Sequence, residues 1–172
     1  DWIMSLSPHW YSTMFGVWFF AGSILSFYAF TALVVLGLQR AGLLKSITTE
    51  HYHDIGKFMF GHTIFWAYIA FSQFFLIWYA NIPEETEYFQ VRVHDGWTLI
   101  SYGLPIVHFF VPFLFLLSRH VKRSPVGLAV GAFWLLFVHA IDIYYAVLPN
   151  LGLHGEHERP QLVLAQVGVE QT

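Results

Sequence analysis

The stretch that decides the fold covers residues 61–85, GHTIFWAYIAFSQFFLIWYANIPEE. It is almost wholly apolar from residue 63 to residue 80. At ~1.5 Å of rise per residue, a helix of this length crosses the ~30 Å hydrocarbon core of a bilayer. Two strongly polar side chains, His62 and Gln73, stand 11 positions apart in it. At ~100° per residue they return to within about 20° of one helix face. The stretch therefore predicts a transmembrane helix whose polar stripe is hidden from lipid.

The composition of the whole chain is that of a membrane protein. Of its 172 residues, 56% are hydrophobic and 11% are charged, whereas soluble domains carry roughly 25% charged residues. Aromatic residues make up 20% of the chain, which suits lipid contact and interfacial belts. The net charge of -3 argues against a nucleic-acid partner. Because the sequence has no cysteine, thiolate-ligated iron–sulfur clusters, zinc–thiolate sites and disulfides are excluded within it.

Three more apolar runs accompany this one. An interfacial segment, residues 1–13, precedes the first run, and a polar tail, residues 149–172, follows the last. We expect the tail to be extended, disordered or docked on a partner. Four spans with short connections predict an all-α, up-down-up-down transmembrane four-helix bundle formed by residues 1–148. The predicted spans cover about residues 14–38, 58–80, 98–118 and 126–148.

The charges of the connections predict an orientation. The first and third connections fall at the same end of such a bundle. They hold most of the basic residues, namely Arg40, Lys45, Lys57, Arg119, Lys122 and Arg123. The opposite end has only Arg92 and Arg159 as basic residues, and it carries the acidic pair Glu84 and Glu85. By the positive-inside rule, the side of Arg40 and Arg119 is predicted to be cytoplasmic and the side of Glu84 periplasmic.

Ionisable side chains within spans are costly in lipid and usually face a bundle interior for a functional reason. At ~1.5 Å per residue, His108 and His139 lie roughly 15 Å from the acidic end, with Asp142 and Gln73 at roughly 10 Å. His139 and Asp142 are three positions apart, so they can face one cavity and interact. We interpret the series as a proton path from side to side. Its members are His62, Gln73, His108, His139 and Asp142, with Glu84 and Glu85 at the outer edge.

Two features of the spans predict local geometry. Gly22 and Ser26 are four positions apart in the first span, which allows a neighbouring helix to approach closely. Pro105 and Pro112 in the third span free backbone carbonyls. A bundle absorbs the resulting kink when neighbouring groups satisfy those carbonyls.

Other interpretations of the polar residues stay open. The histidines could merely lock a structural membrane anchor. His108 and His139 lie on different helices at similar depth, as the axial ligands of a b-type haem would, although bulky neighbours and the two prolines argue against a porphyrin. The runs HYHD (residues 51–54) and HGEHE (residues 154–158) are more typical of solvated loops than of metal sites. Four aromatic residues are predicted to be interface anchors rather than a platform for a quinone, namely Trp10, Trp78, Tyr79 and Trp97.

Three stretches carry a family resemblance: DWIMSLSPHWYSTMFG (residues 1–16), GHTIFWAYIAFSQFFLIWYANIPEET (residues 61–86) and VHAIDIYY (residues 138–145). They resemble the ActF-type membrane subunits of bacterial alternative complex III, a quinol:cytochrome c (or high-potential acceptor) oxidoreductase, within the NrfD/polysulfide-reductase-like group. The resemblance extends to about residue 148, and NIPEET is its most specific part. Family members are about twice as long and contain two four-helix bundles, so the chain is expected to be the C-terminal bundle of a longer polypeptide.

The resemblance implies a subunit of the bacterial inner membrane that has no redox cofactor of its own. Its partners would be a sister NrfD-like membrane subunit, an iron–sulfur subunit and multihaem cytochrome c subunits. The complex would contain iron–sulfur clusters, c-type haems and menaquinol. The resemblance also implies a proton-path role, which falls here on His62, Gln73, His108, His139 and Asp142.

Overall fold

The computed structural model describes residues 3–6, 10–93 and 97–156, and all regular secondary structure in these residues is helical. Four helical segments are long and apolar enough to cross a membrane. They are α1 (Thr13–Arg40), α2 (Thr49–Ala80), the continuous run of α4 (Thr98–Leu104), η2 (Pro105–Phe110) and α5 (Val111–Leu117), and α7 (Pro125–Glu156). The predicted all-α membrane bundle is therefore confirmed.

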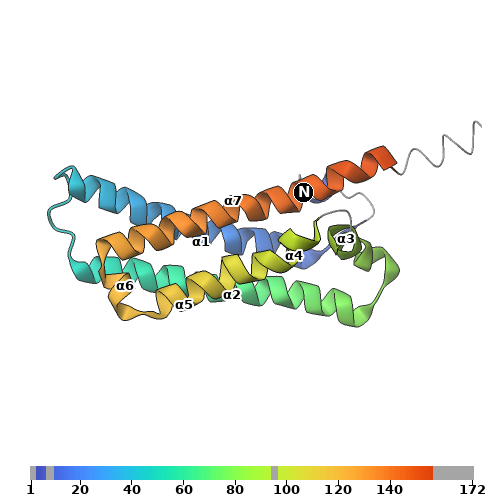
Figure 1. The fold of residues 1–172 in the computed structure, drawn as a ribbon, viewed down its shortest axis with the longest axis horizontal. Coiled ribbons are helices and arrows are strands. Elements are labelled where there is room, and N and C mark those ends of the chain that lie inside the picture. Colours follow the sequence, from blue (N-terminus) through green and yellow to red (C-terminus); the bar gives the residue numbers. More distant parts are fainter. Residues whose placement is uncertain (1–2, 7–9, 94–96, 157–172) are drawn as a thin grey trace, which may run out of the picture.

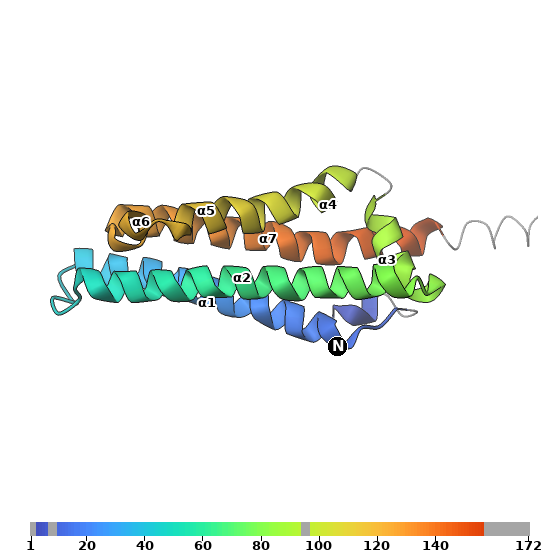
Figure 2. The same ribbon diagram turned by 90° about the horizontal axis from the view of Figure 1, so that it is seen from below.

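The four long segments lie side by side along the length of the molecule (Figures 1 and 2). One end, called here the basic end, holds the loop between α1 and α2 and the short helix α6 (Arg119–Arg123). The opposite end, called the α3 end, holds α3 (Pro83–Val93) and the N-terminal segment with its short helix η1 (Met4–Leu6).

Several segments differ from the predicted boundaries. Helix α2 begins at Thr49, well before residue 58, and the backbone N–H of Thr48 donates to Nδ1 of His51 at its start. The predicted connection of residues 81–97 is largely the helix α3, which Pro83 begins after a left-handed turn at Asn81 (φ 49°). Helix α7 continues to Glu156, so the expectation of an extended or disordered tail is wrong for residues 149–156. The rest of the tail, residues 157–172, lies outside the described residues.

The bundle interior changes in character along its length. From the middle to the basic end it is apolar and tightly packed, and small residues of α1 allow the close packing. Around the outside, large apolar side chains such as Phe27, Phe71, Leu114 and Phe133 are exposed on every long helix. A surface of this kind is stable in contact with lipid or with other membrane helices. The core residues of the basic half include Leu25, Ala29, Leu36, Met59, Leu116, Leu128 and Leu135.

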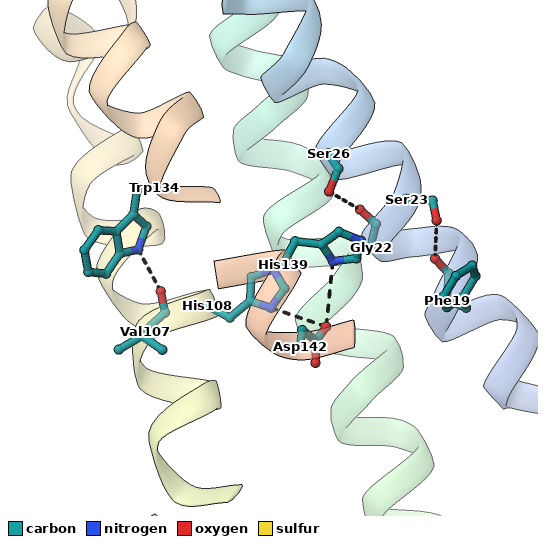
Figure 3. Close-up of polar contacts among 9 residues, drawn as sticks. All are labelled: Phe19, Gly22, Ser23, Ser26, Val107, His108, Trp134, His139 and Asp142. Carbon is teal, nitrogen blue, oxygen red and sulfur yellow. Dashed lines mark hydrogen bonds and ion pairs between the residues drawn. The ribbon is translucent and has the colours of Figure 1, made fainter. Parts of the chain in front are cut away.

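The third span contains a π-helical turn, η2, between its two prolines. In a π-helix the carbonyl of residue 107 would accept from the nitrogen of residue 112, but Pro112 has no N–H. The indole N–H of Trp134 on α7 donates to Val107 O instead, at 2.9 Å (Figure 3). A neighbouring helix thus satisfies the carbonyl, as the sequence predicted. The π-turn also sets the direction in which His108 projects.

Candidate functional site

Three ionisable side chains meet in the middle of the bundle: His108 from η2, and His139 and Asp142 from α7. Their exposed fractions are 0%, 9% and 3%. Oδ2 of Asp142 lies 3.5 Å from Nδ1 of His108 and 3.9 Å from Nδ1 of His139 (Figure 3). We call this group the His–His–Asp cluster. The predicted pairing of His139 with Asp142 is present, and His108 joins it from a different span.

The other two spans form the walls of the cluster. On α2, the Trp66 ring lies over the His108 ring, with centroids 3.8 Å apart. On α1, a Cβ atom placed on Gly22 would lie only 2.5 Å from Cε1 of His139. Glycine therefore provides the space that the imidazole occupies. Gly22 does permit a close approach, as its spacing from Ser26 predicted, and the group that approaches is a side chain of the cluster.

Three of the four ring nitrogens of the cluster have no conventional hydrogen-bond partner among the described groups. Both nitrogens of His108 and Nδ1 of His139 are buried without one, and the separations from Asp142 are longer than the ~2.7–3.2 Å of such bonds. The indole N–H of Trp66 also faces the Asp142 carboxyl without reaching hydrogen-bond geometry. Leaving a buried polar atom unpaired costs about 1–3 kcal/mol. Several such atoms at one place mark a functional site more than a structural one.

The arrangement suits proton sharing. Two imidazoles and one carboxyl lie close enough for their titrations to be coupled, so that the cluster gains and loses protons as a unit. Two imidazoles and a carboxylate are also a donor set that can bind a metal ion. The three donor atoms lie within 4.8 Å of one another. Bonds of ~2.0–2.2 Å to one ion would draw the ligands closer together than this. The spacing therefore fits proton exchange better than coordination.

The haem alternative fits the geometry poorly. A bis-histidine haem needs its porphyrin plane between the two imidazoles. The ring centroids of His108 and His139 are 6.0 Å apart, and the group that faces both Nδ1 atoms is the Asp142 carboxyl. The haem interpretation stays a prediction that a spectrum tests.

The remaining predicted residues lie away from the cluster. Gln73 is buried on the face of α2 that carries Trp66, two helical turns nearer the α3 end. His62 is half-buried on another face, where its Nδ1 lies 2.8 Å from Phe58 O and its ring packs on Tyr28. The backbone oxygen of Glu85 accepts a hydrogen bond from the indole N–H of Trp10 at the α3 end. The side chain of Glu84 lies outside the described residues.

The predicted ladder of polar residues does not continue through the basic half. In that half the described core is mostly apolar. Its buried Thr63 donates its hydroxyl to Met59 O in the same helix, and the ammonium of the buried Lys122 lies 4.9 Å from the centroid of the Phe60 ring. Of the HYHD run, His51 serves at the start of α2 and Asp54 pairs with Lys57 at the surface. The side chains of the HGEHE run lie outside the described residues.

Sequence reasoning missed the burial of Arg92, which the sequence places in the connection between the second and third spans. Arg92 is 1% exposed. Nη1 donates to Tyr88 O at 2.8 Å, and Nη2 donates to Ala146 O on α7 at 3.1 Å. The guanidinium carbon lies 3.4 Å from the centroid of the Tyr88 ring. Burial lowers the pKa of Arg92 from its ordinary value, and burial raises the pKa of Tyr88 to about 12 although the cation opposes that shift.

Arg92 belongs to a layer that closes the α3 end. The Tyr88 ring stacks on Trp10, with centroids 3.9 Å apart, and Trp10 donates to Glu85 O at 3.1 Å. Trp10 is 5% exposed, so its prediction as an interface anchor is wrong. On the other side, the Ser101 hydroxyl bonds to Arg92 O and lies 2.7 Å from the Tyr145 hydroxyl. The polar groups of the interior thus continue from the cluster toward this end.

Comparison of the sequence with models of known protein families and with curated proteins finds no match.

Proposed function

We propose that the chain is an integral membrane subunit of a bacterial respiratory quinol:cytochrome c (or high-potential acceptor) oxidoreductase, alternative complex III. In this proposal it supplies a scaffold and an intramembrane proton path, without a redox cofactor of its own. The resemblance of residues 1–16, 61–86 and 138–145 supports the choice of complex. The observation that carries the proton role is the buried His–His–Asp cluster, whose members have no other evident reason to be placed together in an apolar bundle.

The proposal extends to orientation and partners. The basic end would face the cytoplasm and the α3 end the periplasm, following the distribution of Lys and Arg. The apolar faces of the long helices offer contact area for lipid and for a sister NrfD-like subunit. An iron–sulfur subunit and multihaem cytochrome c subunits would hold the redox groups, and menaquinol would be oxidised in the partner subunits.

The geometry suggests how a proton is held. A proton bound at Nδ1 of either imidazole is within 3.5–3.9 Å of Asp142 Oδ2. A shift of a few tenths of an ångström would make a charge-assisted hydrogen bond along which the proton can transfer. Trp66 and Gly22 restrict how far the two imidazoles can move. The chain's own residues therefore hold one mobile proton at a defined position in the membrane.

The test is the number of protons moved per electron in proteoliposomes that contain the intact complex. Asp142→Asn keeps the shape of the side chain but removes its proton-binding oxygen. We expect it to retain assembly and quinol oxidation and to lose much of the proton movement. Asp54→Asn, at a surface ion pair, is the matched control and should behave as wild type. Equal proton-to-electron ratios in the two variants would overturn the proton role and favour the structural anchor.

A further inference from the structure

We propose that the basic end binds the phosphate group of an anionic phospholipid, between α6 and the first turns of α2. The ligands of the phosphate are Lys122 and Arg119, both on α6. The lipid would occupy this site whether or not the chain moves protons. It gives an anionic partner to a buried lysine that the proposed proton path does not use.

Lys122 packs against α2 instead of extending into water. The residue is only 9% exposed. A Cβ atom placed on Gly56 would lie 2.9 Å from Cγ of Lys122, so glycine provides the space for the lysine stem. The ammonium lies 4.9 Å from the centroid of the Phe60 ring. No group among the described residues forms a hydrogen bond or an ion pair with this ammonium, and a buried charge without an anion is costly.

The acids of the basic end are paired with other cations. This end carries six basic residues and two acids, Glu50 and Asp54. Oδ1 of Asp54 lies 2.7 Å from Nζ of Lys57, and the Glu50 carboxylate pairs with Arg123. The charge of Lys122 is therefore not neutralised by an acid of the described residues. An anion from outside the chain would supply the missing charge.

Arg119 adds a second cation to the site. It lies three positions before Lys122 on α6, so the two side chains can lie on the same face. Arg119 is exposed, and in the described part of the chain no acid pairs with it. The charges of Arg119, Lys122 and Lys57 all act on His53 of α2, so these cations gather around one position between the two helices. A phosphate at that position would accept hydrogen bonds from an ammonium and from a planar guanidinium.

The surroundings of the site match a lipid better than a free anion. Lys122 contacts α2 at Gly56 and Phe60, where the helix changes from polar to apolar sequence. Phospholipid headgroups meet the hydrocarbon layer at such a boundary. Further along α2, a Cβ added to Gly61 would meet open space, and Ile64 is exposed, so acyl chains can lie against the helix next to the phosphate. Basic pockets between membrane helices bind anionic headgroups in this way.

The experiment uses a phosphatidylglycerol that carries a photoreactive group close to its phosphate. It is added to the intact complex in a neutral detergent, at a concentration that fills the site only in part. Irradiation links the bound lipid to the protein, and mass spectrometry measures the labelling yield on peptides from α6 and the start of α2. We expect unlabelled phosphatidylglycerol to lower this yield. Phosphatidylcholine and inorganic phosphate, compared at matched ionic strength, should leave it unchanged.

A variant of Lys122 tests the ligand. Lys122→Met removes the charge and keeps an unbranched apolar stem, so the packing on Gly56 is retained. We expect the labelling yield to fall about fivefold, which corresponds to ~1 kcal/mol for one basic residue near a membrane surface. Lys45→Met removes the same charge from the exposed loop between α1 and α2. It is the matched control and should keep the wild-type yield.

Several results would overturn the lipid site. They are a wild-type complex without labelling of these peptides, equal competition by phosphatidylcholine, displacement by inorganic phosphate, and a wild-type yield in Lys122→Met. Should Lys122→Met not assemble, Arg119→Gln changes an exposed residue and should also lower the yield about fivefold; an unchanged yield there would overturn the proposal. The proton-to-electron ratio of Asp142→Asn is independent of all these results and tests the proposed function separately.

Discussion

Replacing Gly22 by alanine tests whether α1 holds His139 in place. The added methyl carbon would lie 2.5 Å from Cε1 and 3.0 Å from Nδ1 of His139. The imidazole ring must therefore move by about 1 Å, and Asp142 and His108 restrict that movement. Overpacking of this kind costs about 1–3 kcal/mol. Alanine is also the better helix former by roughly 0.5–1 kcal/mol. The measured loss in the free energy of unfolding is therefore smaller than the cost of the clash.

Gly16 provides the matched control. It lies on the same helix, and nothing is within 4 Å of the position that its Cβ would take. Gly16→Ala therefore gains the helix-forming contribution without the clash. The difference between the two variants should be about 1–3 kcal/mol in the free energy of unfolding, measured by detergent-induced unfolding in mixed micelles.

A double-mutant cycle identifies the clashing group. In a His139→Ala background the ring is absent, so Gly22→Ala should lose most of its cost. In the intact complex, Gly22→Ala should also lower the proton-to-electron ratio, because the displaced imidazole no longer faces Asp142. If Gly22→Ala unfolds at the same free energy as Gly16→Ala, the packing of His139 on α1 is wrong.

Three further predictions concern the parts around the cluster. Trp134→Phe should cost about 1 kcal/mol by leaving Val107 O without its donor, whereas Trp78→Phe, at an exposed position, should change the free energy of unfolding little; equal losses would contradict the role of the indole. Tyr88 has a folded-state pKa of about 12 against an ordinary 10.0, so the folded state holds its proton more tightly and should lose stability as the pH rises from about 10 toward 12. Tyr88→Phe should reduce that dependence, and a wild-type curve that matches Tyr88→Phe would refute it. His62→Phe should leave the proton-to-electron ratio unchanged, because His62 lies on a different face of α2 from Trp66, which contacts the cluster, and its ring packs on Tyr28; a lowered ratio would restore His62 to the path.

The spans could be predicted because hydropathy is summed over long windows, and an apolar run of about 20 residues has few structural alternatives to a transmembrane helix. Helix α3 was missed because its sequence, PEETEYFQVRV, is polar and begins with proline and acids. The burial of Arg92 depends on a carbonyl of α7, which no local pattern contains. The spacing of Tyr88 and Arg92, one helical turn apart, was the available signal.

The site shows the same division. His139 and Asp142 could be paired from their i,i+3 spacing. The joining of His108 depends on the rotation of the third span, which the π-turn between Pro105 and Pro112 sets. The prediction that His62 and Gln73 share one face of α2 assumed a straight helix with ~100° of rotation per residue. The buried stripe of α2 instead repeats every seven residues, through Tyr52, Met59, Trp66 and Gln73, and at that period an 11-residue spacing is about 50° off the stripe.

The central claim is that the His–His–Asp cluster changes its protonation while the complex works. The most direct measurement is an infrared difference spectrum of the intact complex during quinol oxidation, in the region of the carboxyl C=O stretch. We expect a band that appears or disappears with turnover, shifts in deuterated water and is absent in Asp142→Asn. A spectrum in which the Asp142 carboxyl shows no change between resting and turning-over complex would contradict the claim and leave the cluster as a structural element.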